Sequence, residues 1–268
     1  MILDCSKYVG PCRCGREHTL ETKKVVVEYH ALDKFDQYMD EVGLTGKRAV
    51  IYDTNTYNLP TLKHVRADQE IVLNAEGLHS EKGMIEDMMR QLDHPDVIVA
   101  VGSGTIMDFG RYPAYHLGIP FVAVPTLASS DGFTANICSI IIDGQKKSSP
   151  MQAAALVVCD LNVVSGAPLW LTVSGISDIL AKYISLADWK IAHLVSGEYY
   201  CPMVADLAQE ALTIMRKAAD DMAAGGKPDF EAMTMAQMIS GLTMQLLNHS
   251  RAASGAEHLM AHLVEMKP

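Results

Sequence analysis

VIVAVGSGTIMD, at residues 97–108, joins an apolar run to a turn that contains two glycines. Residues 97–101 are rich in β-branched side chains, which is typical of a fully buried strand in a parallel sheet. After Gly102, Ser103 and Gly104, apolar residues recur at helical spacing. Such a turn favours a phosphate group, because glycine lets an anion approach the backbone and the helix N-terminus attracts negative charge. By itself the pattern is weak evidence, since many similar turns bind no ligand.

Strands alternate with helices around this turn. Further strands are predicted at residues 24–29, 49–52, 70–73 and 121–124, with segments of helical periodicity between most of them. This alternation predicts an α/β domain with a parallel, doubly wound sheet of Rossmann-like type. Ligands bind beyond the carboxyl ends of the strands in such sheets, so Asp53, the Gly102 turn and the loop after residue 124 are expected on one rim.

The character of the chain changes near residue 164. Residues 137–142 and 155–159 are expected to pair as strands around Asp143 and Gly144, and the remainder of the chain is helix-forming. We therefore predict an α/β domain over residues 1–164 and an all-helical domain over residues 165–268.

Composition narrows the classes of partner. The 268 residues are 49% hydrophobic with a net charge of −10, which argues against nucleic acid or an anionic membrane surface as partner. Six cysteines do not amount to a disulfide scaffold, and no apolar run reaches the length that we associate with a membrane span. We expect a cytoplasmic protein that binds a small molecule and forms a homo-oligomer, a dimer or larger.

Two groups of residues have the chemistry of metal ligands. Cys12, Cys14 and His18 lie close in sequence, but a tetrahedral site needs a fourth ligand, and a thiol-lined surface turn is the simpler interpretation. Asp178 lies in an otherwise apolar helix, and the alternative is that it pairs with Lys182 one turn later. His258 and His262, four residues apart, project from one helical face and would suit Zn²⁺, although such pairs are more often core or surface residues.

Four blocks in order carry a resemblance to a known family: VGSGTIMD at 101–108, VPTLASSDGFTA at 124–135, SGISDILAKYISLADW at 174–189 and SRAASGAEHLMAHLVEM at 250–266. Together they resemble the sn-glycerol-1-phosphate dehydrogenases, particularly the bacterial members. This family belongs with the glycerol dehydrogenases, the iron-type alcohol dehydrogenases and the 3-dehydroquinate synthases. The resemblance covers nearly the whole chain.

The resemblance implies a domain that holds NAD or NADP and a helical domain that holds one divalent metal, Zn²⁺ or alternatively Ni²⁺ or Fe²⁺. It assigns the cofactor to Asp53, Gly102, Ser103, Gly104, Thr105, Asp108, Thr126 and Ser129. An acidic residue at the Asp53 position favours a ribose 2′-hydroxyl over a 2′-phosphate. The same matching makes Asp178 and His258 metal ligands. It makes Asp131, near the substrate, and His262, near the nicotinamide, catalytic residues.

The implied reaction is the reduction of dihydroxyacetone phosphate to sn-glycerol 1-phosphate. Ser250 and Arg251 could help to bind the phosphate, or Arg251 could be a surface charge. In the family the third metal ligand is a histidine in a later segment, so we expect the chain to be truncated at its C-terminus and catalysis to be impaired. Three alternatives remain: a glycerol or other polyol dehydrogenase, a 3-dehydroquinate synthase-like lyase, and a nucleotide-binding module without turnover.

Overall fold

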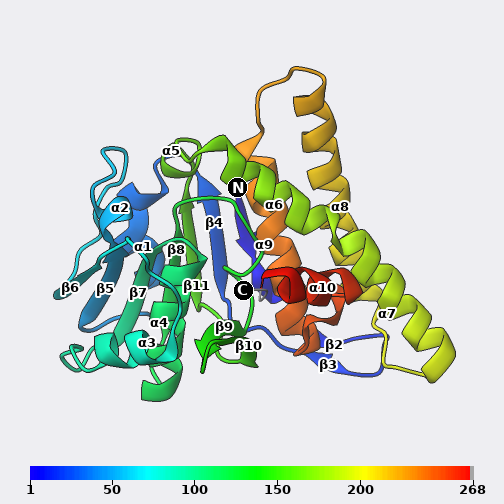
Figure 1. The fold of residues 1–268 in the computed structure, drawn as a ribbon, viewed down its shortest axis with the longest axis horizontal. Helices are drawn as coiled ribbons and strands as arrows, with labels where there is room; N and C mark the ends of the chain where they lie inside the picture. The colour runs from blue at the N-terminus through cyan, green and yellow to red at the C-terminus, as the bar shows by residue number, and fades with distance from the viewer. Residues whose placement is uncertain (266–268) are drawn as a thin grey trace. The chain divides into compact units, whose positions relative to one another are not determined.

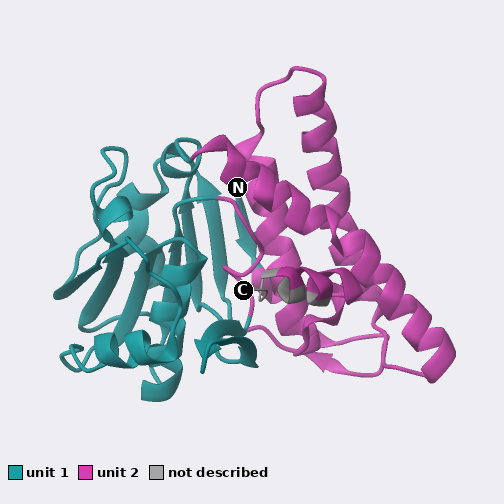
Figure 2. Cartoon of the chain, viewed as in Figure 1, with its two compact units in different colours: residues 1–4, 21–127, 136–167 teal, residues 5–20, 128–135, 168–268 magenta. Residues whose placement is uncertain are grey.

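The chain forms two compact units (Figure 2). The computed structural model describes residues 1–265, apart from the side chains of Leu259, His262, Leu263 and Glu265. Unit 1 comprises residues 1–4, 21–127 and 136–167, and unit 2 comprises residues 5–20, 128–135 and 168–268. The last boundary between the units follows residue 167, whereas the sequence predicts a boundary after residue 164. The structure differs in giving two segments from earlier in the chain, residues 5–20 and 128–135, to the helical unit. The His18 side chain bonds to the Leu246 carbonyl, and the Ala128 carbonyl accepts a hydrogen bond from the Gln237 side chain.

Unit 1 is built on a seven-stranded sheet with the order β1–β4–β11–β8–β7–β5–β6 (Figure 1). The strands are β1 (Ile2–Asp4), β4 (Lys24–Glu28), β5 (Arg48–Asp53), β6 (Gln69–Leu73), β7 (Val97–Gly102), β8 (Phe121–Pro125) and β11 (Leu156–Asp160). Every pairing is parallel except that of the edge strand β1 with β4. The helical segments of this unit are η2 (Ala31–Lys34), α1 (Phe35–Glu41), α2 (Thr54–Tyr57), α3 (Lys82–Met89), α4 (Gly104–Leu117) and α5 (Leu161–Val164). The predicted doubly wound α/β fold is confirmed.

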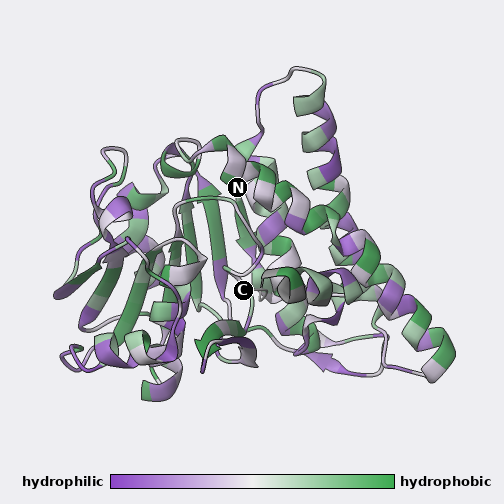
Figure 3. Cartoon of the chain, viewed as in Figure 1, coloured by the Kyte–Doolittle hydropathy of each residue, from purple (hydrophilic) through white to green (hydrophobic). Residues whose placement is uncertain are grey.

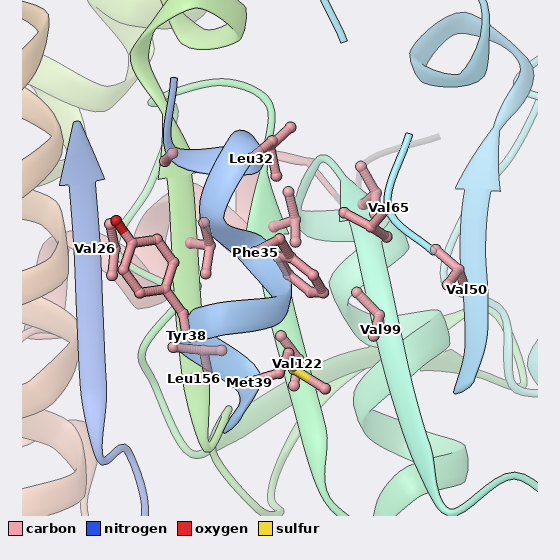
Figure 4. Close-up of a cluster of buried hydrophobic side chains, with 14 of the residues drawn as sticks. Val26, Leu32, Phe35, Tyr38, Met39, Val50, Val65, Val99, Val122 and Leu156 are labelled. Atoms are coloured by element: carbon pink, nitrogen blue, oxygen red, sulfur yellow. The ribbon is translucent and has the colours of Figure 1, made fainter. Parts of the chain in front are cut away.

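The central strands are buried along their whole length, and they are the most uniformly hydrophobic segments of the sheet (Figure 3). Val99 of β7 lies opposite Val50 of β5 on one side and Val122 of β8 on the other. Helix α1 packs over this face with Phe35 and Met39 (Figure 4). The apolar run that the sequence analysis starts from is therefore at the centre of the core of unit 1.

The predicted pairing of residues 137–142 with residues 155–159 is wrong. Strand β9 (Ile137–Ile142) pairs antiparallel with β10 (Gln145–Pro150), while β11 joins the main sheet between β4 and β8. Asp143 and Gly144 form the two-residue turn with positive φ at both positions, as tight hairpins require. The segment QKKSSP at residues 145–150 has no apolar alternation, so its strand was not visible in the sequence.

The order of the strands places a ligand-binding position in unit 1. From β5 the chain proceeds outward to β6 on one side and then returns to β7 on the other side. The two strands next to each other at this reversal, β5 and β7, end at Asp53 and Gly102. Open α/β sheets bind ligands outside the carboxyl ends of the strands at such a switch point. Asp53 and the Gly102 turn are therefore neighbours at the position where this fold binds nucleotides.

Unit 2 is helical, with a small hairpin from the N-terminal part of the chain. Its helices are α6 (Leu169–Leu180), α7 (Lys182–Ser196), α8 (Pro202–Ala223), α9 (Phe230–Leu247) and α10 (Ala256–Glu265), with the short turns η1 (Cys5–Tyr8) and η3 (Ser250–Ala252). The hairpin consists of β2 (Gly10–Pro11) and β3 (Glu17–His18). Helix α9 is buried around most of its circumference, which is typical of the central helix of a bundle.

One stretch of unit 2, Leu169–Ser196, is long and apolar enough to cross a membrane by length and composition. No apolar run of that length is expected from the sequence, and the difference arises because the stretch combines α6 and α7. It contains Asp178 and Lys182, which bind each other. A single stretch of this kind is weak evidence for a membrane span, because core helices of globular proteins pass the same criterion.

A carboxylate–phenol pair connects the sheet of unit 1 to its covering helix. The Tyr38 hydroxyl of α1 donates a hydrogen bond to Glu28 at the end of β4, and this bond lowers the pKa of the Glu28 carboxyl despite partial burial. The Tyr38→Phe variant is expected to lose about 1.5 kcal/mol of unfolding free energy at neutral pH. Because the pKa of Glu28 is lower in the folded chain, this stabilisation is present above the ordinary glutamate pKa of about 4.3 and is lost as the pH falls. Urea unfolding of both proteins from pH 7 to pH 3 measures it, and a constant difference over that range would contradict the assignment.

Candidate functional site

The turn between β7 and α4 has the features of a phosphate site. A Cβ atom on Gly102 would lie 2.8 Å from the Ile106 side chain, so this position requires glycine. At Gly104, by contrast, a Cβ atom would meet no atom within 4 Å. Ser103 is the N-cap residue of α4, but within the described residues its side chain accepts no capping hydrogen bond from the first turn of the helix. The first N–H groups of a helix of 14 residues therefore face open space at the switch point, which fits a pyrophosphate group.

Three further residues of the predicted cofactor set, Thr105, Thr126 and Ser129, are divided between the two units. The Thr126 amide, just after β8, donates to the Gly102 carbonyl at 3.2 Å and so joins two loops at the strand ends. Thr105 is half-buried in the first turn of α4. Ser129 belongs to unit 2, where it is half-buried in the segment 128–135. Their contacts with a cofactor stay a prediction.

Asp53 has a structural role at the end of β5. Its carboxylate accepts hydrogen bonds from the Thr56 amide at 2.8 Å and the Thr56 hydroxyl at 3.0 Å, and so caps α2. A carboxylate has about four lone-pair positions, so these two bonds leave capacity for a ribose hydroxyl. The cofactor role of Asp53 stays a prediction alongside its capping role.

Asp108 faces a different part of unit 1 from the Gly102 turn. Its carboxylate accepts from the Ser80 hydroxyl at 2.9 Å and from the Cys138 thiol of β9 at 3.2 Å. Burial raises the pKa of Asp108, although Arg111 opposes this effect. In the structure Asp108 connects α4 to the β9–β10 hairpin, and its assignment to the cofactor stays a prediction.

A buried charge cluster lies in unit 2, formed by Asp131, Asp178, Lys182 and Ser240. The Lys182 ammonium lies 3.0 Å from Asp178 Oδ1 and 3.2 Å from Asp131 Oδ2. Asp178 Oδ2 accepts from the Asp131 amide at 3.0 Å, and Asp131 Oδ2 accepts from the Ser240 hydroxyl at 2.8 Å. The Lys182 side chain is 2% exposed, and the side chains of Asp131 and Asp178 are 10% and 19% exposed, so one buried ammonium is shared by two largely covered carboxylates.

The charged groups of this cluster shift one another's pKa values. Burial and the neighbouring Asp131 carboxylate raise the pKa of Asp178 above its usual range. Burial lowers the pKa of the Lys182 ammonium, but the two carboxylates outweigh burial and the net shift is upward. Lys182 is therefore fully protonated at neutral pH, and two adjacent carboxylates depend on its single charge.

Two glycines make room for the segment that carries Asp131. A Cβ atom on Gly175 of α6 would lie 2.1 Å from the Ala128 carbonyl oxygen. A Cβ atom on Gly241 of α9 would lie 2.1 Å from Thr134 Oγ1 and 2.3 Å from the Asp131 carbonyl oxygen. The Gln237 amide donates to the Ala128 carbonyl at 2.9 Å. The segment 128–135 thus lies directly on α6 and α9, which fixes the position of the Asp131 carboxylate.

Replacing the second glycine tests this close approach. The Gly241→Ala variant is expected to lose about 2–3 kcal/mol of unfolding free energy, because the new methyl group would overlap a backbone carbonyl in a packed core. Gly83→Ala is the matched control: it is also a helical glycine, but a Cβ atom there would meet nothing within 4 Å. That control is expected to be neutral or slightly stabilising. Equal stability of the two variants in urea unfolding would contradict the packing described.

The described residues do not assemble a catalytic metal site around Asp178. Both of its oxygens are engaged, one by the Lys182 ammonium and the other by the Asp131 amide. His258 lies half-buried in α10, and the side chain of His262 lies outside the described residues. A divalent metal at Asp178 would therefore have to displace Lys182, and the ligand roles of Asp178 and His258 stay predictions. The alternative pairing of Asp178 with Lys182 is what the structure shows.

Arg251 has a partner of its own. Its guanidinium makes a two-pronged ion pair with Glu198, at 3.0 Å through Nε and 3.2 Å through a terminal nitrogen. The pair lies beside a hollow of about 560 Å³ that is also lined by Ser250 and His249. A phosphate bound by Arg251 would have to compete with the Glu198 carboxylate, so its substrate role stays a prediction.

Several residues of these sites were missed in the sequence. Ser240 meets Asp131, and the Cys201 sulfur lies 3.3 Å from His18 Nε2, only through the tertiary fold, and nothing in their local spacing marks either residue. Gly241 did carry a signal, because a glycine inside a long helix usually has a packing reason. Cys201 directly precedes Pro202 at the start of α8, which marks a helix boundary but not a ligand.

Known proteins are similar to this chain along its whole length. Residues 26–168 match the family described as iron-containing alcohol dehydrogenase. A glycerol-1-phosphate dehydrogenase [NAD(P)+] of Bacillus licheniformis is 35% identical over 100% of this chain and 69% of its own length. The enzyme with the same name from Geobacillus stearothermophilus is 39% identical over 96% of this chain and 66% of its own length.

Solved structures share the fold. A glycerol dehydrogenase from Schizosaccharomyces pombe superposes with a TM-score of 0.72 at 22% identity, covering 90% of this chain and 64% of the other. An iron-containing alcohol dehydrogenase from Thermococcus thioreducens gives a TM-score of 0.74 at 15% identity, covering 94% and 71%. The chain therefore spans about two thirds of the length of the proteins that it matches.

Proposed function

The chain belongs to the iron-containing alcohol dehydrogenase family, and from this membership we propose that it reduces dihydroxyacetone phosphate to sn-glycerol 1-phosphate with NADH or NADPH. Its curated relatives are NAD(P)-dependent dehydrogenases named for glycerol 1-phosphate, which supports both the cofactor and the substrate. The structural observation that carries the proposal is the open, glycine-lined N-terminus of α4 at the switch point of the sheet.

The Gly102 turn is proposed to hold the pyrophosphate. The first-turn N–H groups of α4 point to the anion, while Gly102 keeps the turn tight against Ile106. Asp53, at the end of the adjacent strand, is proposed to accept a hydrogen bond from a ribose hydroxyl, which would favour NADH over NADPH. When bound, the nicotinamide supplies the hydride for reduction of the substrate carbonyl.

Unit 2 supplies the polar groups for the rest of the reaction. Reduction of a carbonyl creates an alkoxide that needs a proton, and His262 stays our predicted donor. Asp131 is held in place by Ser240 and Lys182, so its carboxylate is fixed before substrate binds. A divalent metal belongs to the chemistry of the family, but the Asp178 carboxylate here holds the Lys182 ammonium.

The same ion pair favours a second candidate function. A chain in which Lys182 occupies the Asp178 carboxylate could bind the nucleotide without turning over a substrate. One measurement distinguishes the two candidate functions. Both require binding of NADH, but only the first requires its oxidation.

The test measures binding and turnover separately. Calorimetric titration with NADH is expected to show binding, and NADH oxidation is then followed with dihydroxyacetone phosphate in the presence of Zn²⁺ or Ni²⁺. Glycerol with NAD⁺ provides the comparison substrate. Turnover of glycerol without turnover of the phosphate ester would indicate a polyol dehydrogenase, and binding without either turnover would favour the second function. Absence of NADH binding would overturn both.

A further inference from the structure

Three thiols and an imidazole meet in unit 2, and none of them takes part in the Asp131 cluster. They are Cys12, Cys14, His18 and Cys201, and their ligand atoms all lie within 4.8 Å of one another. In the part of the chain that the structure describes, no other group of three or more His, Cys, Asp or Glu side chains gathers in this way. We propose that these four residues form a tetrahedral Zn²⁺ site with a structural role.

The distances agree with those of a tetrahedron. With bonds of about 2.3 Å to sulfur and 2.0–2.1 Å to nitrogen, tetrahedral zinc separates two sulfurs by about 3.8 Å and a sulfur from a nitrogen by about 3.6 Å. The Cys12 and Cys201 sulfurs lie 3.9 Å apart. His18 Nε2 lies 3.4 Å from the Cys14 sulfur and 3.3 Å from the Cys201 sulfur. These three separations thus lie within about 0.3 Å of those that the ion imposes, and the remaining pairs of ligand atoms lie within 4.8 Å.

The imidazole is oriented as in zinc sites. His18 is buried, and its Nδ1 lies 2.7 Å from the Leu246 carbonyl oxygen at the end of α9. A carbonyl oxygen can only accept, so Nδ1 carries the proton and Nε2 presents its lone pair to the three sulfurs. Histidine ligands of zinc commonly donate their second N–H to a carbonyl or carboxylate in this way.

The backbone around the first two cysteines is a tight hairpin turn. The Cys12 amide donates to the Arg16 carbonyl at 2.9 Å, and the Gly15 amide donates to the Cys12 carbonyl at 3.0 Å. Gly15 has a φ of +86°, which favours glycine and lets the chain reverse between Cys14 and His18. The turn directs Cys12 and Cys14 to the same point as His18 on β3.

Neighbouring groups suit a site with three thiolates. Zn²⁺ with three thiolates has a net charge of −1, which hydrogen-bond donors and a nearby cation stabilise. The Tyr199 hydroxyl lies 3.0 Å from the Cys14 sulfur, and the Arg16 guanidinium lies 3.4 Å from the centre of the Tyr199 ring. Cys201 stands at the N-terminus of α8, where the helix dipole favours a thiolate.

The fourth ligand explains what the ion would do. Cys201 and His18 are 183 residues apart, so the ion would fasten the β2–β3 hairpin to the start of α8. Through the bond from His18 to Leu246, the same hairpin is fixed to the end of α9. A disulfide between Cys12 and Cys201 is the rival interpretation, but it would require the sulfurs to approach from 3.9 Å to about 2.05 Å.

The experiment uses cobalt as a spectroscopic substitute for zinc in the full chain, purified under reducing conditions. Co²⁺ bound by thiolates has a sulfur-to-metal charge-transfer absorption that oxygen and nitrogen ligands lack, so a catalytic ion at Asp178 and His258 cannot imitate it. We expect this absorption in the unmodified protein at one Co²⁺ per chain, and its displacement by Zn²⁺. Cys12→His keeps four ligands and is expected to reduce the absorption by about a third, because one of three thiolates is lost.

Two further variants complete the test. Cys201→Ser removes one thiolate and the only ligand from the start of α8, so it is expected to lower the absorption by at least a third and to weaken Co²⁺ binding, whereas the control Cys138→Ser, a buried cysteine outside the cluster, is expected to retain both. Absence of charge-transfer absorption in the unmodified protein would overturn the proposal whether or not the variants fold. An absorption of unchanged intensity and Co²⁺ affinity in Cys201→Ser, or an intact mass showing a Cys12–Cys201 disulfide after purification under reducing conditions, would overturn it as well.

Discussion

The Lys182→Met variant is expected to lose about 3–5 kcal/mol of unfolding free energy. Lys182 is 2% exposed and its ammonium lies within 3.2 Å of both the Asp131 and Asp178 carboxylates. Methionine has a similar volume but no charge, so the variant leaves the buried Asp131 carboxylate and the half-buried Asp178 carboxylate without a cation. Breaking a buried ion pair on one side carries a penalty of this size, because the remaining charge has no water to solvate it. Urea unfolding at neutral pH measures the loss.

A double variant separates the lost charge from the lost side chain. Adding Asp178→Asn to Lys182→Met removes one of the stranded carboxylates, so a substantial part of the stability is expected to return. Lys217→Met is the matched surface control, because Lys217 pairs with Asp221 on an exposed face of α8, and its removal is expected to leave the unfolding free energy nearly unchanged. If Lys182→Met were as mild as Lys217→Met, Lys182 would not be the cation that holds this cluster together.

Local sequence patterns were sufficient to predict the parallel sheet on which unit 1 is built. Residues 97–101 predict a buried parallel strand, and β7 occupies the interior of the sheet. The position of Asp53 beside the Gly102 turn followed from a rule about strand ends, and the strand order supports it. The resemblance to the glycerol-1-phosphate dehydrogenases is confirmed by relatives that share 35% and 39% of their aligned residues. These features depend on periodicity and on motif order, which a linear sequence retains.

Contacts between distant segments were not predictable in the same way. Three of the four residues at the proposed zinc site lie within one short motif, but Cys201 comes from the start of a helix far along the chain. The segment 128–135 follows a strand of unit 1, yet its bonds to Gln237 and Ser240 place it in unit 2. Residues 145–150 form a strand only because the turn at Asp143 and Gly144 brings them back along β9. In each case a tertiary partner, rather than local propensity, determines the structure.

The Gly104→Asp variant is expected to weaken NADH binding by about 30- to 150-fold while leaving the fold intact. Gly104 is the first residue of α4, and a side chain there would enter open space at the switch point. An aspartate at a helix N-terminus interacts favourably with the dipole, so folding stability is expected to be unchanged or slightly higher. If pyrophosphate occupies this position, however, two like charges meet, which costs about 2–3 kcal/mol of binding free energy.

Gly104→Asn is the matched control, since asparagine has nearly the same size and no charge. It is expected to weaken binding only a few-fold, so the ratio of the two dissociation constants isolates the electrostatic repulsion. Repulsion between exposed charges is screened by salt, so the difference between the variants is expected to shrink as ionic strength rises. Calorimetry with NADH at two salt concentrations, together with thermal unfolding of all three proteins, makes the comparison. Equal affinities of Gly104→Asp and the unmodified protein would show that the pyrophosphate does not bind at the N-terminus of α4. Because Gly104→Asp is expected to keep or raise the folding stability while it lowers the affinity for NADH, a loss of structure cannot be mistaken for the expected result.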